Sequence, residues 1–205
     1  MERLRLNEWK IAERGFNPDT ITKNGNKFFI GNGYLGIRGT LEEFEKDKLP
    51  AINLAGIYDQ VGDAWREPLN APNALFTYIM VDGIRYAIPE VTPVSHEIIL
   101  DYRKGIFLRE TTFQTRKGQI HIASKRLASL ASPHVIAMKY KIWADFNGEI
   151  ILVTGIDADV WDINGPHYVN LDFSIKDVAP IYNMLEVVGT TGENQNEVEN
   201  AQKKL

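Results

Sequence analysis

The sequence predicts an all-β fold in which two antiparallel sheets face each other as a sandwich, with one or two short helices. From residue 28 onward, short runs rich in Ile, Val, Phe, Tyr and Thr are separated by Gly, Pro, Asn and Asp at intervals of roughly 8–12 residues. Apolar and polar side chains alternate within these runs, so that Ile120 and Ile122 share one face of a strand while His121 points to the other. Sheets with one apolar face each bury those faces against each other.

The first part of the chain is less regular. Residues 1–24 form a polar leading segment with scattered apolar anchors and an Asn-Pro-Asp turn at residues 17–19. The run LEEFEKDK (residues 41–48) predicts a short helix, and residues 198–205 predict a second one. Residues 64–76 combine two prolines and two asparagines with aromatic anchors, which indicates an ordered loop that lines a groove or crosses a sheet edge.

The central part of the chain predicts a meander of three strands. Residues 94–103 and 106–115 flank Lys104-Gly105, which has the length of a two-residue hairpin loop. Residues 119–130 follow as the third strand. Neighbouring strands joined by short loops are typical of an antiparallel sheet.

Two dipeptides predict further hairpins, because each tolerates the positive φ angles of a type I′ turn. Asp82-Gly83 lies between the apolar runs 78–81 and 84–88. Asn147-Gly148 lies between residues 134–146 and 149–156 and is the strongest hairpin signal in the chain.

The composition bounds the size and class of the protein. At 205 residues and 23.3 kDa, with 44% hydrophobic and 24% charged residues, the chain is globular and has room for one large domain or two small ones. Lys and Arg number 23 and Asp and Glu number 27, which gives a net charge of −4, so nucleic acid is not expected as a partner.

The absence of cysteine excludes disulfides, thiol catalysis and cysteine-ligated metal sites, and it fits a reducing compartment. No apolar run reaches the roughly 18 residues that cross a bilayer, and the first residues lack the apolar stretch of a secretory signal. We therefore expect a cytoplasmic protein that does not bind a membrane.

A glycine-rich motif at residues 31–39 (GNGYLGIRG) formally matches the dinucleotide-binding pattern G-x-G-x-x-G. That pattern needs a helix that opens at its third glycine within a βαβ unit, and Gly39 and Thr40 interrupt any such helix here. We interpret the motif as structural: its glycines allow a tight turn and a close approach of strands, and Arg38 pairs with a carboxylate. The residues of this motif are Gly31, Asn32, Gly33, Tyr34, Gly36, Arg38 and Gly39.

The loop at residues 155–167 (GIDADVWDINGPH) carries the candidate binding groups. Its aspartates lack the spacing of a calcium loop, so we expect them to accept hydrogen bonds from backbone amides and expect no metal. Trp161 offers a flat apolar face beside directional polar groups, a combination that holds carbohydrate by stacking and hydrogen bonding. In the alternative reading, Trp161 packs on the sandwich and His167 begins a strand. The predicted substrate-binding residues are Trp161, Asp162, Asn164 and His167.

No catalytic centre is predicted within the chain. Nothing positions a serine beside a histidine, and the nucleophile motif G-x-S-x-G is absent. The histidines lie too far apart in the sequence for a local metal motif, so each is expected to be an ordinary surface or core residue. They are His96, His121, His134 and His167.

Several motifs, in order along the chain, resemble the N-terminal domain of glycoside hydrolase family 65. The match runs over roughly residues 8–190 and rests on GNGYLGIRG (31–39), EEF (42–44), LAGIYD (54–59), LNAPNAL (69–75) and GIDADVWDINGPH (155–167). The family includes inverting phosphorylases of maltose, kojibiose, nigerose, trehalose and trehalose 6-phosphate.

The resemblance implies a β-super-sandwich of the galactose mutarotase-like kind over residues 1–190. Residues 191–205 would be a polar tail or the start of a linker toward an (α/α)6 catalytic barrel. In such enzymes a glutamic acid of the barrel protonates the glycosidic oxygen, while inorganic phosphate as co-substrate attacks the anomeric carbon from the opposite face. The resemblance thus implies no catalytic residue and no cofactor in this chain, which would be inactive alone.

The expected roles of the domain are to pack on the barrel, to shape the mouth of the active site with a loop, and to help form a homodimer. The disaccharide, and the choice between phosphorolysis and hydrolysis, stay open. The alternative is a free-standing carbohydrate-binding sandwich or a mutarotase-like enzyme, in which His and Glu on one concave sheet perform acid–base chemistry on a free sugar. The candidates for that chemistry are His96 with Glu97, and His121.

Overall fold

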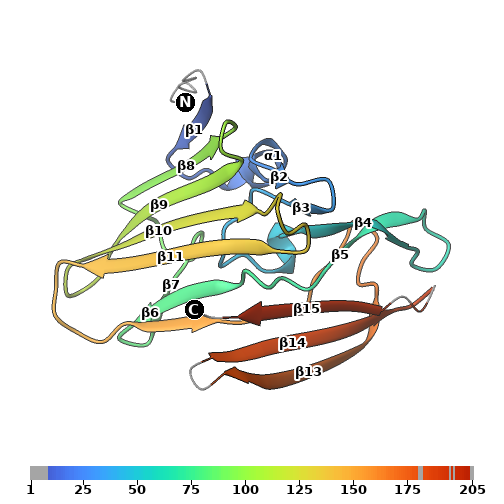
Figure 1. The fold of residues 1–205 in the computed structure, drawn as a ribbon. Coiled ribbons are helices and arrows are strands. Elements are labelled where there is room, and N and C mark those ends of the chain that lie inside the picture. Colours follow the sequence, from blue (N-terminus) through green and yellow to red (C-terminus); the bar gives the residue numbers. More distant parts are fainter. Residues whose placement is uncertain (1–8, 180–181, 194, 196, 204–205) are drawn as a thin grey trace.

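The structure, a computed structural model, describes residues 9–179, 182–193, 195 and 197–203. The regular structure of the described part is mostly antiparallel strands, arranged in four sheets (Figure 1), which confirms the predicted all-β class. The largest sheet has the order β1 (Lys10–Arg14), β8 (Ser95–Asp101), β9 (Ile106–Gln114), β10 (Gln119–Ala128) and β11 (Ile136–Ala144). A four-stranded sheet has the order β2 (Ile30–Gly31), β3 (Leu35–Ile37), β4 (Ile52–Asp59) and β5 (Glu67–Asn70). The three-stranded sheets are β12 (Ile151–Thr154), β6 (Thr77–Val81) and β7 (Ile84–Tyr86), and β13 (Tyr168–Ala179), β14 (Tyr182–Thr191) and β15 (Glu197–Lys203).

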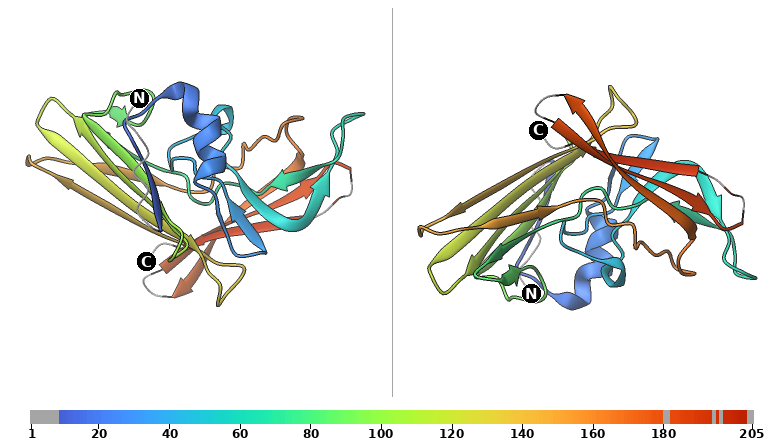
Figure 2. Two further views of the ribbon diagram at one scale, coloured as in Figure 1. Left: turned by 90° about the horizontal axis from the view of Figure 1, so that it is seen from above. Right: turned by 90° about the horizontal axis from the view of Figure 1, so that it is seen from below.

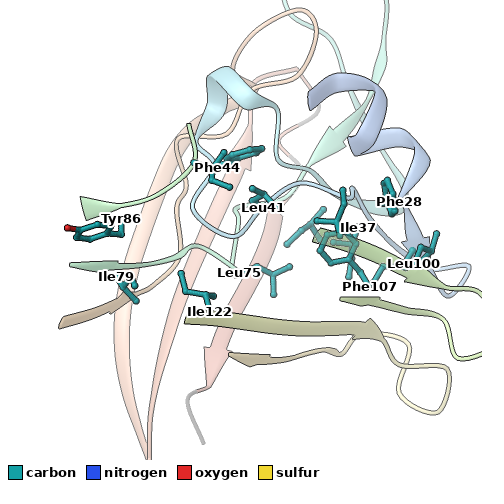
Figure 3. Packing of buried hydrophobic residues seen from close by; sticks show 14 of the residues in the cluster. Phe28, Ile37, Leu41, Phe44, Leu75, Ile79, Tyr86, Leu100, Phe107 and Ile122 are labelled. Carbon is teal, nitrogen blue, oxygen red and sulfur yellow. The ribbon is translucent and has the colours of Figure 1, made fainter. Parts of the chain in front are cut away.

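The hydrophobic core lies between the five-stranded sheet and the shorter sheets (Figure 2). Phe107 and Ile122 point into it from the five-stranded sheet, while Ile37 and Ile79 come from the other strands (Figure 3). None of these four side chains is more than 2% exposed. The β4–β5 hairpin projects beyond the body of the sandwich (Figure 1), and this is where the candidate site lies.

The predicted meander is confirmed as β8, β9 and β10, but its first loop is longer than expected. Asp101 pairs with Ile106, so four residues separate the paired positions, and the Asp101 carboxylate accepts a hydrogen bond from the Lys104 N–H (3.1 Å). The second predicted hairpin is also confirmed. Asp82 and Gly83 join β6 to β7 with φ angles of 51° and 75°, the left-handed values that the Asp-Gly pair supplies.

The hairpin predicted at Asn147-Gly148 is wrong. β11 pairs with β10, whereas β12 pairs with β6 in another sheet, so residues 145–150 cross between sheets. Neither Asn147 nor Gly148 has a positive φ. The Asp145 carboxylate instead accepts a hydrogen bond from the Gln119 N–H (2.6 Å), which fixes the start of the crossing to β10. A local turn signal was outweighed by the backbone pairing that the edge of β6 offers.

The helix predicted over residues 41–48 is wrong apart from a 3-10 turn, η2 (Lys46–Lys48). Residues 41–44 are buried in succession, at no more than 5% exposure each. A surface helix would have turned part of that run toward solvent. The segment 64–76 is also more regular than predicted, because it contains β5.

The second predicted helix and the polar tail are replaced by β15 within the described residues; residues 204–205 lie outside them. Val198 is buried at 3% exposure. Asn200 and Gln202 donate side-chain hydrogen bonds to the carbonyls of Pro72 (2.6 Å) and Ala74 (3.0 Å). Polar residues that suggested a tail therefore belong to a strand whose side chains are satisfied by the neighbouring loop.

The leading segment contains two elements that the sequence did not reveal, β1 and α1 (Ile21–Lys27). The predicted turn at residues 17–19 is present as part of η1 (Pro18–Thr20), where the Asn17 side chain accepts a hydrogen bond from the Asp19 N–H (2.9 Å). The sequence ITKNGNK of α1 contains Gly and Asn, which are poor helix formers, so local propensity concealed the helix.

The glycine motif forms the β2–β3 hairpin, as predicted for a structural turn. The Asn32 carboxamide oxygen accepts hydrogen bonds from the N–H groups of Tyr34 (3.0 Å) and Leu35 (2.7 Å), which closes the turn. A Cβ on Gly36 would lie 2.5 Å from the ring of Phe29, so this close approach requires glycine.

Arg38 does not pair with a carboxylate, contrary to the prediction. Its guanidinium donates to the side-chain oxygen of Asn26 (3.1 Å) and to the carbonyls of Leu49 (2.9 Å) and Thr22 (3.0 Å). All three acceptors are uncharged. The acidic residues that follow Arg38 in the chain, Glu42 and Glu43, pair with other arginines, as described below.

Candidate functional site

His167 lies among three carboxylates, between the loop 155–167 and the β4–β5 hairpin. Its Nδ1 is 3.1 Å from Asp59 Oδ2 and its Nε2 is 2.9 Å from Glu67 Oε1. Asp162 Oδ2 lies 3.7 Å from the same Nε2. All four side chains are buried. Both ring nitrogens are thus engaged within the protein, and His167 fastens the loop to the hairpin.

The charges of this cluster stabilise the protonated histidine. Burial by itself lowers the pKa of His167, but hydrogen bonds to Glu67 and Asp59 and the charge of Asp162 outweigh it, and the pKa is raised. Burial raises the pKa of Asp162 to about 6. The folded protein therefore holds protons in this cluster at pH values where the unfolded chain has released them.

Asparagine side chains complete the link between loop and hairpin. Asn70, at the end of β5, donates from Nδ2 to the carbonyl of Trp161 (2.9 Å). Asn164 donates from its N–H to Glu67 (2.9 Å) and from Nδ2 to the carbonyl of Trp65 (3.1 Å). The loop backbone is consequently fixed at two points, at Trp161 just before the turn and at Asn164 within it.

Three apolar side chains project outward from this fixed backbone. Trp161 is 41% exposed, Trp65 is 61% exposed and Ile163 is 78% exposed. The Lys46 ammonium lies 4.8 Å from the centre of the Trp161 ring and pairs with Asp159 (2.7 Å). Exposed aromatic faces beside amide and carboxylate groups are suited to a ligand with one apolar face and several hydroxyls.

The structure separates the predicted site residues by exposure. Trp161 is exposed, Asn164 is half-buried, and His167 is buried. Asp162 is half-buried as a whole residue, but its side chain is buried. Two of the three loop aspartates accept backbone hydrogen bonds as expected, Asp157 from the Asp159 N–H (3.0 Å) and Asp162 from the Asn70 N–H (3.2 Å), whereas the Asp159 carboxylate pairs with Lys46.

The β4–β5 hairpin contributes three residues to the site that no sequence pattern indicated, namely Asp59, Trp65 and Glu67. These residues lie roughly 100 positions before their partners in the loop. Only the pairing of β4 with β5 brings these residues next to the loop 155–167. That pairing was not predicted, because the Pro and Asn residues of β5 argued against a strand.

The residues considered for mutarotase-like chemistry do not form one site. His96 points into the core, at 7% exposure, and its Nδ1 is 2.8 Å from Thr111 Oγ1. His121 lies on the other side of the same sheet, where it contacts Thr112 (2.9 Å) and stacks on Trp143. Neighbouring Thr111 and Thr112 face opposite ways in β9, so the sheet separates the two histidines.

A buried ionic cluster on the core side of the five-stranded sheet was also not predicted. Arg109 donates to Glu42 (2.9 Å) and to both oxygens of Glu43, and Ser124 donates to Glu42 (2.6 Å). Arg126 lies 3.5 Å from the same Glu42. Strand alternation could have located it, because the inward positions of β9 and β10 include both arginines.

His96 gives the core a measurable pH response. Burial, and then the charge of Arg109, lower the pKa of His96 from 6.5 to about 3. The unfolded chain binds this proton below pH 6.5 and the folded chain does not, so stability falls as the pH is lowered. Between pH 7 and pH 4 the free energy of unfolding should fall in both the wild type and His96→Gln. We expect the fall to be about 2–3 kcal/mol smaller in His96→Gln, which lacks this histidine. Urea unfolding at both pH values measures this, with His121→Gln as the matched variant on the outer face; equal losses in His96→Gln and the wild type would contradict it.

Among the described residues, no group of three or more His, Cys, Asp or Glu side chains is arranged to hold a metal ion. No helix in the described part is long and apolar enough to span a membrane. The site is thus one of exposed aromatic and polar groups on a fixed loop.

Residues 11–204 match the model of the N-terminal domain of glycosyl hydrolase family 65. The chain belongs to this family. As a family 65 N-terminal domain, it is 56% identical over 165 residues to nigerose phosphorylase of Lachnoclostridium phytofermentans, covering 80% of this chain and 22% of that protein.

More distant relatives agree with this assignment. The family 65 domain is 35% identical to 1,2-alpha-glucosylglycerol phosphorylase of Bacillus selenitireducens, over 78% of this chain and 21% of that one. It is 30% identical to kojibiose phosphorylase of Halothermothrix orenii, over 80% of this chain and 21% of that protein. A solved structure of a candidate kojibiose phosphorylase from the human microbiome superposes on 98% of this chain, which corresponds to 30% of that structure's chain. The TM-score is 0.74 at 20% sequence identity, which shows that the two share a fold. The chain spans about a fifth of the length of the curated relatives.

Proposed function

We propose that this chain is the sandwich domain of an inverting disaccharide phosphorylase that cleaves an α-glucosidic disaccharide with inorganic phosphate. The observation that carries the proposal is the 56% identity to a nigerose phosphorylase over 80% of this chain. In this proposal the general acid and the phosphate site lie in the part of the full-length polypeptide that corresponds to the remainder of the relatives. The domain alone is then inactive, needs no cofactor, and is part of a cytoplasmic homodimer.

The exposed surface of the loop 155–167 supports a role at the mouth of the active site. Trp161 and Trp65 present aromatic faces from a backbone that His167 and Asn164 hold in place. We infer that these two tryptophans contact the sugar and that Asp162 and Asn164 stand beside them as polar partners. His167 acts in this proposal as a positioning residue, because neither ring nitrogen is open to a ligand.

A row of exposed apolar side chains on β13 supports packing against a further domain. Leu171, Phe173 and Ile175 alternate along this edge strand at 36%, 63% and 69% exposure, and Val169 before them is 59% exposed. Contiguous apolar surface on a sheet edge marks an interaction site. We infer that the catalytic domain of the full-length polypeptide covers it.

The proposal is tested by assaying the product of the complete gene and the 205-residue chain in parallel. Each is incubated with phosphate and nigerose, kojibiose, maltose, trehalose or trehalose 6-phosphate, and release of glucose 1-phosphate is measured. We expect the complete product to phosphorolyse one of these sugars and the 205-residue chain to phosphorolyse none. A complete product that binds the sugars without cleaving them would favour the carbohydrate-binding sandwich instead.

Trp161→Ala and Trp65→Ala in the complete enzyme should each raise KM for the disaccharide by about 5–30-fold, which corresponds to a lost aromatic contact of about 1–2 kcal/mol. Because both side chains are exposed, Tm should fall by no more than a few degrees. Tyr102→Ala, which removes an exposed aromatic group from the β8–β9 loop, is the control. A large fall in Tm with unchanged KM would place these tryptophans among the structural residues.

A further inference from the structure

The side of the five-stranded sheet that faces away from the core carries a shallow hollow of about 280 Å³. The smallest side chain that lines it belongs to Ala123 of β10, whose partners directly across the neighbouring strands are Glu110 on β9 and Lys141 on β11. These three strands lie side by side (Figure 1), with neighbours about 4.8 Å apart. A methyl group between two long side chains leaves the hollow open, and its volume is near the lower end of the range of small-molecule sites.

The hollow has an apolar floor and a charged rim. Ala123, Leu108 and Ile99 line it as half-buried residues, whereas Glu110 and Lys141 are exposed. Glu110 and Lys141 start two strands apart, about 10 Å, and they form no ion pair with each other. A carboxylate that accepts hydrogen bonds, an ammonium group that donates them and an apolar floor between the two suit the hydroxyls and the C–H face of a sugar ring.

One end of the hollow carries positive charge that the chain does not neutralise. Lys125 is directly opposite Lys139 across the β10–β11 pair, and Lys141 is two residues further along β11. Like charges at directly opposed positions destabilise a sheet. The three lysines are exposed and make no hydrogen bond or ion pair with any residue that the structure describes. An anion between Lys125 and Lys139 would remove their repulsion.

The carboxylates that line the hollow do not balance these lysines. Glu97 pairs with Arg14 at 2.7 Å, so its charge is already neutralised within the chain. Glu110, the other lining carboxylate, has no partner within the described part of the chain. The lysines therefore outnumber the free carboxylate, and the surplus of positive charge favours a ligand that carries negative charge.

We propose that the hollow binds a hexose monophosphate, with the phosphate between Lys125 and Lys139 and the sugar ring over Ala123. Lys125 and Ala123 are two residues apart in the same strand, about 7 Å, a distance that a phosphorylated pyranose spans. The two ammonium groups bind the phosphate oxygens by charge-assisted hydrogen bonds. Glu110 and Lys141 bind hydroxyls at opposite edges of the ring.

This site goes beyond the proposed function. None of the residues that line the hollow belongs to the loop 155–167, where the disaccharide is proposed to bind. The two are connected by chemistry, because phosphorolysis of a glucosidic disaccharide releases a hexose phosphate. Glucose 1-phosphate is therefore the probe for the hollow.

The test is isothermal titration calorimetry of the 205-residue chain with glucose 1-phosphate, glucose and inorganic phosphate, at low and high salt. We expect one glucose 1-phosphate per chain with a Kd of about 0.1–1 mM at low salt, and weaker binding at high salt. Glucose and inorganic phosphate should each bind about fivefold more weakly or less, because each fills only one half of the site.

Two variants separate the halves of the site. Lys125→Gln removes one ammonium group and should raise the Kd of both glucose 1-phosphate and inorganic phosphate by about tenfold. Ala123→Leu fills the hollow beneath the ring and should raise the Kd of glucose 1-phosphate by about tenfold, while that of inorganic phosphate changes by less than about twofold. Lys104→Gln, in the β8–β9 loop outside the hollow, is the matched control and should leave every Kd unchanged.

Two results overturn the proposal. One is the absence of saturable binding of glucose 1-phosphate up to about 10 mM. The other is equal binding of glucose 1-phosphate and inorganic phosphate that Ala123→Leu does not change, which would show a surface that attracts anions and does not recognise the sugar.

Thermal unfolding shows whether each protein is folded, and Ala123→Val replaces Ala123→Leu if the latter is not. Should the 205-residue chain itself lack a cooperative transition, the titrations are made with the complete gene product, where Lys125→Gln should remove one of the glucose 1-phosphate sites. Absence of this binding in an active enzyme rejects the inference alone, whereas absence of phosphorolysis with intact binding rejects the proposed function alone.

Discussion

Arg109→Met should lower the free energy of unfolding by about 3–5 kcal/mol, the largest effect expected of a single substitution in this chain. Arg109 is buried, and its guanidinium supplies hydrogen bonds to Glu42 and Glu43 at once. Methionine fills a similar volume but leaves two buried carboxylates with only Arg126 to balance them. Urea or thermal unfolding at pH 7 measures the loss, and Arg116→Met, on the exposed β9–β10 loop, is the matched control.

The loss should depend on pH in a defined direction. Burial by itself raises the pKa of Glu42, but the charges of Arg126 and Arg109 outweigh it and lower the pKa. The stabilisation that the ionised Glu42 carboxylate contributes is complete above the pH range in which carboxyl groups ordinarily titrate. It disappears as the pH falls through the lowered pKa of Glu42. The difference between the wild type and Arg109→Met should therefore shrink in acid. Arg109→Met combined with Glu43→Gln should recover part of the stability at pH 7. An Arg109→Met variant as stable as Arg116→Met would show that the cluster contributes nothing.

His167→Leu should cost about 3 kcal/mol or more at pH 6, because it leaves Asp59 and Glu67 buried without a cation. It should also release the loop 155–167 from the β4–β5 hairpin. Limited proteolysis is then expected to cut the variant at residues 60–66 or within the loop before the core opens. His134→Leu is the control, since His134 is exposed and its ring packs edge-on against Tyr34, at 4.3 Å between ring centroids.

The pH dependence of this loss has the opposite sign to that of His96. The pKa of His167 is raised, so its stabilisation is complete below the unfolded value near 6.5 and is lost as the pH rises through the folded pKa. Burial raises the pKa of Asp162 to about 6 whether or not His167 is present, so the comparison with the variant isolates the contribution of the histidine. The difference between wild type and His167→Leu should be larger at pH 6 than at pH 9. A difference that grows with pH would contradict the protonated state assigned to this histidine.

Alternation and turn chemistry predicted the elements in which local and tertiary preferences agree. The β8–β10 meander and the Asp82-Gly83 hairpin belong to this group, since each strand pairs with its neighbour in the chain. The prediction failed at Asn147-Gly148, where the next strand pairs with β6 instead. It also failed at residues 41–48, because charged residues that resemble a helix surface are buried against arginines from distant strands.

The candidate site was predictable only in its local half. Trp161 and its loop were identified from their composition, which a sequence shows directly. The pairing of His167 with Asp59 and Glu67 depends on a long hairpin whose second strand contains Pro68, and proline within a run argues against a strand. Contacts between segments so far apart leave no local pattern.

The pairing of β1 with β8 has a consequence for how the chain reaches this structure. Residue 10 lies beside residue 101, so β1 has no pairing partner until the chain has been synthesised through β8. Sheets closed by such distant pairings form slowly, in milliseconds to seconds. During that interval β1 is an unpaired edge, and slower synthesis or a lower temperature during expression should favour the correctly closed sheet over aggregation.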